Sequence, residues 1–232
     1  MSHAWLWTIA ERTGQRERLR SALFRRRYGF DPPPEWSDLT GYEALLDVVL
    51  AERLHELPGD VLEIGVLMGG GTAKLCGLFG RLAPDKRVIA ADLFDPSFDP
   101  TMSPLGLSMA QIYHVTIGDH GRDQRAVFDR VTAGARNLVV VAGDSTTVEI
   151  PTAQLAFAFI DGHHATEYVR ADFDTAWSRT VPGGVVAFHD YAGDLRHLTA
   201  AIHRLIGEHA DEIDRVWTNG IIMFVKRVKP TA

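Results

Sequence analysis

Five carboxylates end or directly follow apolar runs of the type that forms buried strands: Glu63, Asp92, Asp144, Asp161 and Asp190. In open α/β sheets, ligands bind outside the carboxyl ends of the strands, so these five side chains are expected to share one rim. Glu63 can accept hydrogen bonds from a cationic or amino-bearing ligand there, whereas it would repel a phosphate. The pattern therefore predicts a ligand site at the rim.

Asp161 and Asp190 follow two apolar runs, at 155–160 and 185–188. If those runs form neighbouring strands about 4.8 Å apart, the two carboxylates converge. They then share a proton or hold a cation between them, and oxygen ligands favour Mg²⁺. His189 as a third ligand would favour Mn²⁺ or another transition metal. The alternative is that these residues cap helices or line a solvated rim.

Two histidines, His163 and His164, follow Asp161 by two and three positions. A neutral histidine is the side chain best suited to take a proton from a hydroxyl near neutral pH. We expect one of the pair to act as this base, while its neighbour serves as polar filler.

A glycine-rich turn follows the first apolar run, with Gly65, Gly69, Gly70 and Gly71 leading into a helix-like stretch. Such a turn lets a ligand approach the backbone and the free N–H groups of the helix start, which favours a nucleotide-like cofactor. The spacing departs from G-x-G-x-x-G. Asp92 ends the second apolar run 27 residues after Gly65, where an acid hydrogen-bonds ribose hydroxyls.

Composition bounds the class of protein. The chain has 232 residues, 46% of them hydrophobic, with a formal charge of −6. That charge offers no basic face for nucleic acid. The single cysteine, Cys76, permits neither an internal disulfide nor a cysteine zinc site and is expected in the core. With no long apolar run, we predict a cytoplasmic protein that does not span a membrane.

Residues 1–57 are predicted to be an N-terminal helical extension. Leu19, Leu23 and Phe24 recur at helical spacing among arginines, as do Trp5, Leu6 and Ile9 further upstream. These helices can pack on their own domain or form a homo-oligomer through a second subunit, and both are favoured over a membrane surface. Ser37 or Thr40 is expected to cap a further helix over 42–57.

Strands and helices alternate through the domain at 58–232, which predicts an α/β, doubly wound sheet. Residues 93–122 carry prolines and little period, so we expect a mobile lid, followed by a helix over 122–133. Pro182-Gly-Gly184 is expected as a turn before the strand at 185–188. The segments 214–217 and 221–225, joined by Thr218-Asn-Gly220, predict an antiparallel edge.

Several motifs together resemble the class I S-adenosylmethionine-dependent methyltransferases. They are Glu63-Ile-Gly-Val-x-x-Gly-Gly-Gly-Thr72, Asp92-Leu-Phe94, Gly143-Asp-Ser145, Phe159-Ile-Asp-Gly-x-His164 and Pro182-Gly-Gly-Val-Val-Ala-Phe-His-Asp-Tyr191. Within that superfamily they are similar to the branch of macrocin-type sugar O-methyltransferases and cephalosporin-hydroxylase-like proteins. The resemblance implies a Rossmann-like sheet of seven strands in the order 3-2-1-4-5-7-6, with the last strand antiparallel.

The resemblance also implies roles for individual residues. Glu63, Gly65 and Gly69 would line the methionine and ribose side of S-adenosylmethionine, and Asp92 would bind its ribose. Asp144 and Ser145 would flank the adenine. Asp161 and Asp190 match metal-binding carboxylates and His164 matches a general base, whereas His189 stands where the better-understood sugar methyltransferases carry an acid.

The function expected on this basis is O-methylation of a small hydroxylated acceptor, of sugar or natural-product type, assisted by Mg²⁺ or Mn²⁺. The metal would lower the pKa of the acceptor hydroxyl, and His164 would remove its proton. Two alternatives stay open, namely a metal-independent methyltransferase and a cofactor-binding protein of the same fold without methyl transfer.

Overall fold

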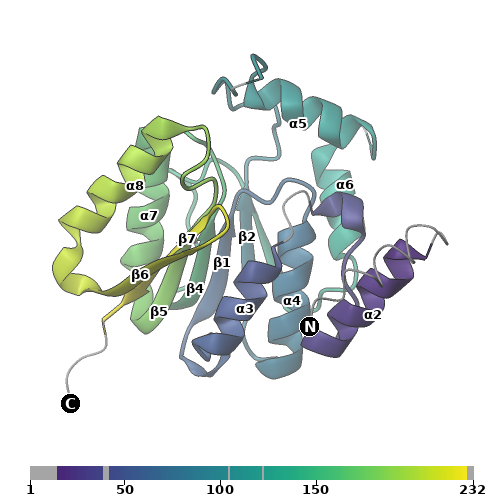
Figure 1. Ribbon diagram of the computed structural model, residues 1–232, viewed down its shortest axis with the longest axis horizontal. Helices are drawn as coiled ribbons and strands as arrows, with labels where there is room; N and C mark the ends of the chain where they lie inside the picture. The colour runs from purple at the N-terminus through teal and green to yellow at the C-terminus, as the bar shows by residue number, and fades with distance from the viewer. Residues whose placement is uncertain (1–14, 39–41, 104, 122, 229–232) are drawn as a thin grey trace.

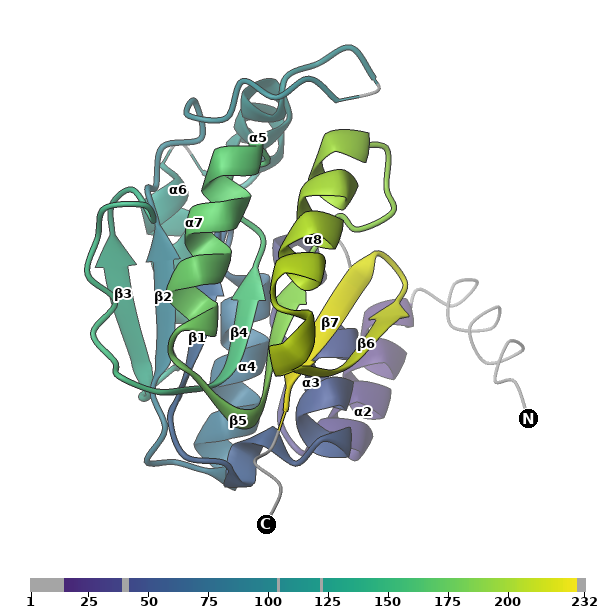
Figure 2. The ribbon, with the colours of Figure 1, turned by 90° about the vertical axis from the view of Figure 1, so that its left-hand side faces the viewer.

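The computed structural model describes residues 15–38, 42–103, 105–121 and 123–228. Its sheet has seven strands in the order β3-β2-β1-β4-β5-β7-β6. They are β1 Asp60–Ile64, β2 Val88–Asp92, β3 Leu138–Ala142, β4 Leu155–Ile160, β5 Thr180–Phe188, β6 Ile213–Asn219 and β7 Ile222–Arg227. The first five strands are parallel, and β7 is antiparallel to both β5 and β6. The predicted strand order is therefore confirmed (Figure 2).

Helices cover both faces of the sheet (Figures 1 and 2). One face carries α2 Arg16–Tyr28, α3 Glu43–Ala51, α4 Gly70–Leu82 and α6 Gln124–Thr132, and the other carries α7 Thr166–Trp177 and α8 Arg196–Glu208. Successive strand side chains point to opposite faces, so Val61 packs in the core under α3 and α4 while Leu62 packs under α7 and α8. Short 3₁₀ turns occupy Glu35–Ser37, Leu54–Glu56 and Ala210–Glu212.

The N-terminal helices pack against the sheet domain. Phe24 and Tyr28 of α2 are buried in the same core as Leu46 of α3 and Phe79 of α4. The predicted helix over 42–57 is shorter than expected, because α3 ends at Ala51 and a 3₁₀ turn follows. Trp5, Leu6 and Ile9 lie outside the described residues, and the role in a homo-oligomer stays a prediction.

Ser37 does not cap α3, so this prediction was wrong. Its hydroxyl donates to the carbonyl of Pro34, and the residue that reaches the start of the helix is Asp38, whose Oδ1 accepts from the Tyr42 backbone N–H at 3.3 Å. Thr40, the other expected cap, lies outside the described residues. A carboxylate at a helix N-terminus is favoured by the helix dipole as well as by the hydrogen bond.

The segment after β2 has more regular secondary structure than its composition suggested, and its mobility stays a prediction. It contains α5 Met109–Gly118, which begins with a capping box between Ser108 and Gln111. Figure 1 shows α5 above the upper edge of the sheet, beyond the ends of β1 and β2. The expected helix over 122–133 is α6, which starts later, after the N-cap Asp123.

Pro182-Gly-Gly184 does not precede its strand, as the sequence had suggested, but lies within β5. The pairing of β5 with β4 shifts register at this point, which places Thr180 opposite Leu155 and Val185 opposite Phe157. Such an irregularity accommodates Pro182 and the left-handed Gly183 inside a strand.

Cys76 is buried in the core, as predicted. No helix among the described residues is long and apolar enough to cross a membrane.

Candidate active site

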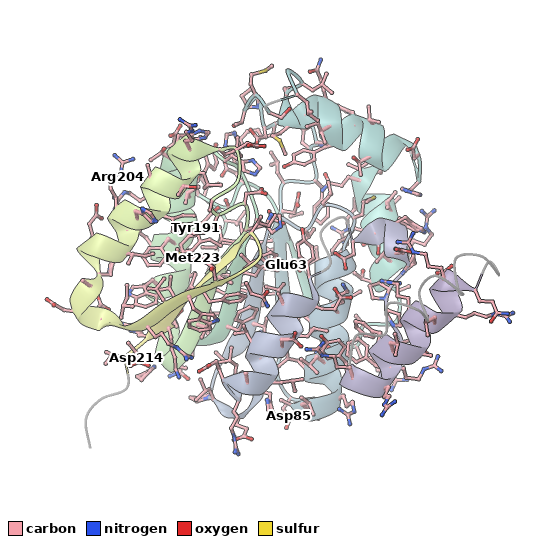
Figure 3. All side chains as sticks on the ribbon, viewed as in Figure 1. Glu63, Asp85, Tyr191, Arg204, Asp214 and Met223 are labelled. Atoms are coloured by element: carbon pink, nitrogen blue, oxygen red, sulfur yellow. The ribbon has the colours of Figure 1, made fainter. Side chains whose placement is uncertain are left out.

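A cavity of about 250 Å³ opens at the carboxyl ends of β1, β2, β4 and β5, where the sequence predicted the site. The predicted residues on its wall are Glu63, Gly65, Asp92, Asp144, Ser145, Asp161, His163, His189 and Asp190. Figure 3 shows Glu63 near the upper end of the sheet, below α5. The segment after β2 and α5 add an apolar wall through Phe98, Met109, Ile112 and Tyr113. His164 lines a smaller adjoining cavity.

Glu63 is buried, with 1% of its surface exposed. Burial raises the pKa of this carboxyl to about 8; the hydrogen bond that Thr72 donates to it acts in the opposite direction, and the nearby Asp161 and Asp92 raise it further. The carboxyl is thus held largely protonated near neutral pH. A cationic ligand beside it would favour the charged form.

The glycines of the turn are required by the protein's own atoms, whereas the sequence suggested that the approach of a ligand requires them. Gly65 has φ of +80°, and a Cβ there would lie 2.1 Å from the carbonyl oxygen of Asp161. Gly69 has φ of +87° and forms the N-cap of α4, packed against Phe128, away from the cavity wall. Close contact between the turn, β4 and α6 therefore excludes side chains at these positions.

Asp92, the predicted ribose-binding residue, is hydrogen-bonded to the backbone of the glycine-rich turn and of the segment after β2. Its Oδ2 accepts from the backbone N–H of Val66 at 2.7 Å and its Oδ1 accepts from that of Phe94 at 2.6 Å. Gln124 of α6 donates a longer bond of 3.3 Å. Burial raises the pKa of Asp92, and these hydrogen bonds oppose that shift. Oδ1 accepts two of these three hydrogen bonds and Oδ2 accepts one, so Oδ2 is the oxygen that could also accept a ribose hydroxyl.

Asp144 and Ser145 also lie on the cavity wall, as expected of residues beside the adenine. Asp144 Oδ1 accepts from the backbone N–H of Thr146 at 2.9 Å, which closes a local turn after β3. Tyr168 of α7 donates to the other oxygen at 3.4 Å. His163 stacks on Tyr168 with ring centroids 4.3 Å apart. These aromatic rings form one end of the cavity.

The carboxylates of Asp161 and Asp190 converge as predicted, but a histidine lies between them. His189 Nδ1 lies 3.0 Å from Asp161 Oδ1 and 3.2 Å from Asp190 Oδ1. Burial acts against a charged imidazole, yet the two carboxylates raise the pKa of His189 to about 10. The hydroxyl of Tyr42 donates to Asp161 Oδ2 at 2.6 Å. His189 thus serves here as a counter-charge.

His164 is held by two carboxylates. Its Nδ1 lies 2.6 Å from Asp99 Oδ2 and its Nε2 lies 3.0 Å from Asp190 Oδ2. Both acceptors are carboxylates, so both ring nitrogens donate and the ring is an imidazolium. Although burial disfavours this form, Asp190 and Asp99 raise the pKa of His164 to about 9. Nε2 can therefore accept a proton from a ligand only after it has lost the proton that it donates to Asp190.

His163 has a different environment. Its Nδ1 accepts from the backbone N–H of Ala165 at 3.0 Å, at the start of α7. Its Nε2 lies 3.7 Å from Asp99 Oδ1. The ring therefore orders the turn before α7 as well as lining the cavity, so it does more than the polar filler expected of one member of the pair.

Three residues offer ligand atoms for a metal ion. One atom each from Asp161, His164 and Asp190 lie within 4.8 Å of one another. Two carboxylate oxygens and one imidazole nitrogen suit a divalent ion such as Mg²⁺ or Mn²⁺. The histidine of this set is His164, whereas the sequence had suggested His189. Binding would require His164 to lose a proton.

Sequence reasoning missed Tyr42 and Asp99. Asp99 is 5% exposed, and its backbone carbonyl accepts from the N–H of Ala110 in the first turn of α5. Tyr42 comes from the N-terminal segment, 119 positions before Asp161. No local pattern connects residues so far apart in the chain. The Ser108-x-x-Gln111 box was readable, and would have indicated α5.

A family model described as a methyltransferase domain matches residues 62–191, which is more than half of the chain. The chain belongs to this methyltransferase domain family. The matched range contains every predicted site residue, from Glu63 to Asp190. The methyltransferase resemblance drawn from the sequence is thus confirmed at the level of the family. No curated protein matches the chain.

Several solved methyltransferases share the fold. The O-methyltransferase NovP is 19% identical, with 88% of each chain covered and a TM-score of 0.66. CalS11, a TDP-rhamnose 3'-O-methyltransferase of calicheamicin biosynthesis, is 19% identical over 79% of each chain, with a TM-score of 0.53. MycE of the mycinamycin pathway, in complex with Mg and SAH, is 16% identical over 90% of this chain and 54% of its own, with a TM-score of 0.52.

Proposed function

We propose that this methyltransferase transfers a methyl group from S-adenosylmethionine to a hydroxyl of a small molecule of sugar or natural-product type. The observation that carries the proposal is the chain of carboxylates and imidazoles from Asp99 through His164 to Asp190, beside a cavity lined by Glu63 and Asp92. NovP and CalS11, which share the fold, are O-methyltransferases by name. A natural-product acceptor is in keeping with those names.

The cofactor half of the cavity is the part formed by β1, β2 and the turn after β3. Glu63 is placed to meet the cationic methionine end, and Asp92 and Asp144 to meet the ribose and adenine. Binding there would hold the sulfonium methyl facing the carboxylates at the ends of β4 and β5. Rate would come chiefly from positioning, with the acceptor oxygen about 3 to 3.5 Å from the methyl carbon.

His164 is the group we propose to take the acceptor's proton. Asp99 accepts from Nδ1–H and fixes the ring's orientation, as the carboxylate of a catalytic triad does. The other nitrogen, Nε2, donates to Asp190 in the imidazolium form, so the ring must first release that proton before Nε2 can take the proton of the acceptor. The apolar wall of Phe98, Met109 and Ile112 would exclude water from the reacting atoms.

A divalent ion fits the residues present. Asp161 and Asp190 would hold it through one carboxylate oxygen each, which leaves His164 to act as the base, and the ion would lower the pKa of the acceptor hydroxyl as bound metals do for water. That MycE is described with Mg is consistent with this proposal.

The rival is metal-independent transfer, and one observation favours it. His189 already lies within ion-pair distance of both Asp161 and Asp190, so these carboxylates have a positive counter-charge without a metal. In that case the carboxylates would bind the acceptor's hydroxyls directly.

The test is transfer of label from [methyl-¹⁴C]S-adenosylmethionine to a panel of nucleotide-linked deoxysugars and glycosylated natural products, with Mg²⁺, Mn²⁺ or excess chelator. Labelled ether product supports the proposal. Cofactor binding without transfer to any acceptor would contradict it. Loss of turnover in chelator, with restoration by Mg²⁺ or Mn²⁺, supports the metal-assisted reaction, and full activity in chelator establishes the rival.

A further inference from the structure

Tyr42 lies outside the range matched by the family model, yet it forms part of the cavity wall. It immediately precedes α3, and its hydroxyl donates to Asp161 Oδ2 at 2.6 Å. Asp161 Oδ1 lies 3.0 Å from His189 Nδ1. One oxygen of this carboxylate thus accepts a hydrogen bond from Tyr42, and the other lies within ion-pair distance of His189.

The ring of Tyr42 is itself fixed by packing. Its edge-to-face contacts are with Phe159 of β4, at 5.3 Å between centroids, and with His189, at 5.5 Å. The terminal torsion of an aspartate has a broad, roughly two-fold preference and does not select one orientation by itself. A hydroxyl donor on a fixed ring, as in Tyr42, can select one orientation of the Asp161 carboxylate.

The backbone around Tyr42 is anchored to the helix that follows the glycine turn. Asp38 accepts from the Tyr42 N–H and pairs with Lys74 of α4, which is completely buried. Glu43, the residue after Tyr42, lies 3.1 Å from the same ammonium group. Lys74 therefore fixes residues on both sides of Tyr42 to α4.

We propose that Tyr42 is a positioning residue of the active site, which sets the orientation of Asp161 and hence the strength with which Asp161 and Asp190 hold a divalent ion. The orientation follows from the contacts above, whereas its consequence for the ion rests on the proposed function. Removing a residue that hydrogen-bonds to a metal-binding side chain commonly lowers the metal affinity by about 10- to 100-fold.

The variant that tests this is Tyr42→Phe, which keeps the ring and its packing. Its matched control is Tyr28→Phe, because Tyr28 also donates to an aspartate, Asp47, at 2.8 Å, but at the contact of α2 with α3 and away from the cavity. Both variants are checked by far-UV circular dichroism. Binding of Mn²⁺ is then followed by electron paramagnetic resonance in protein saturated with S-adenosylhomocysteine (SAH).

Tyr42→Phe is expected to weaken Mn²⁺ binding by about 10- to 100-fold, while Tyr28→Phe leaves it unchanged. In an Asp161→Asn background, Tyr42→Phe should cause no further loss, since Tyr42 acts through Asp161. Equal Mn²⁺ affinity in wild type and Tyr42→Phe, or an undiminished effect in the Asp161→Asn background, would overturn the proposal.

A second measurement needs no metal. In ¹⁵N-histidine-labelled protein, the Nδ1–H resonance of His189, assigned with His189→Gln, reports the orientation of Asp161. It should move or broaden in Tyr42→Phe and stay unchanged in Tyr28→Phe. If wild type binds no Mn²⁺, the metal-assisted function fails, and this resonance decides the role of Tyr42: an identical signal in Tyr42→Phe refutes it.

Discussion

Proton release on cofactor binding is the sharpest consequence of the burial of Glu63. Burial raises the pKa of this carboxyl to about 8, so it carries about 0.9 proton at pH 7 and about 0.1 at pH 9. S-adenosylmethionine brings a sulfonium and an ammonium group, and a cation beside a carboxyl favours its ionised form. Binding should therefore release close to one proton at pH 7 and very little at pH 9.

Isothermal titration calorimetry in phosphate, Hepes and Tris measures this number as the slope of binding enthalpy against buffer ionisation enthalpy. Glu63→Gln is the matched control, because the amide keeps the shape and the hydrogen bond from Thr72 but cannot ionise. Its slope at pH 7 should be lower than that of wild type by about 0.9 proton. Equal slopes in the two proteins at pH 7 would refute the assignment of Glu63 to the cationic end of the cofactor.

The raised pKa of Glu63 also predicts how the free energy of unfolding changes with pH. Its pKa in the folded protein is raised above the ordinary value of 4.5, so the folded state binds the extra proton and loses free energy of unfolding as pH rises from about 4.5 through about 8. Glu63→Gln should therefore gain in melting temperature relative to wild type between pH 6 and pH 9. A constant difference across this range would show that Glu63 is ionised throughout.

Four further predictions concern other parts of the molecule. Asp99→Asn should lower kcat by about 10²- to 10⁴-fold with cofactor affinity retained, since it disturbs the orientation of the proposed base; unchanged kcat would remove Asp99 from the site. Gly65→Ala should destabilise by about 2 to 4 kcal/mol in urea unfolding, because its Cβ would meet the Asp161 carbonyl. Lys74→Met should cost about 3 to 5 kcal/mol by removing the buried ammonium group that pairs with Asp38 and Glu43. In hydrogen exchange, residues 93–122 should gain protection with cofactor and acceptor, and strong protection in the free protein would make them fixed structure.

The strands β1 to β4 were readable from local pattern because they are largely apolar runs of five or six residues bounded by turns. A strand end also fixes where the next side chain points, so Asp161 and Asp190 could be assigned to one rim before their contact was seen. The motif resemblance supplied the strand order. Local signals predicted the structure less well where proline, glycine and capping residues decide whether an element begins or continues. Pro182-Gly-Gly184 was expected to be a turn but lies within β5, and the capping box that begins α5 was missed.

Proton chemistry at the rim depended on contacts between distant segments. Asp99 meets His164 across 65 positions and Tyr42 meets Asp161 across 119. These partners decide that His164 is held as an imidazolium and that Asp161 has a fixed orientation. A residue's type and sequence neighbours give its ordinary pKa, whereas burial and the charges placed around it by the fold set its actual one. The sequence could therefore name candidates for the reacting groups, while only the packed chain determined their protonation and their partners.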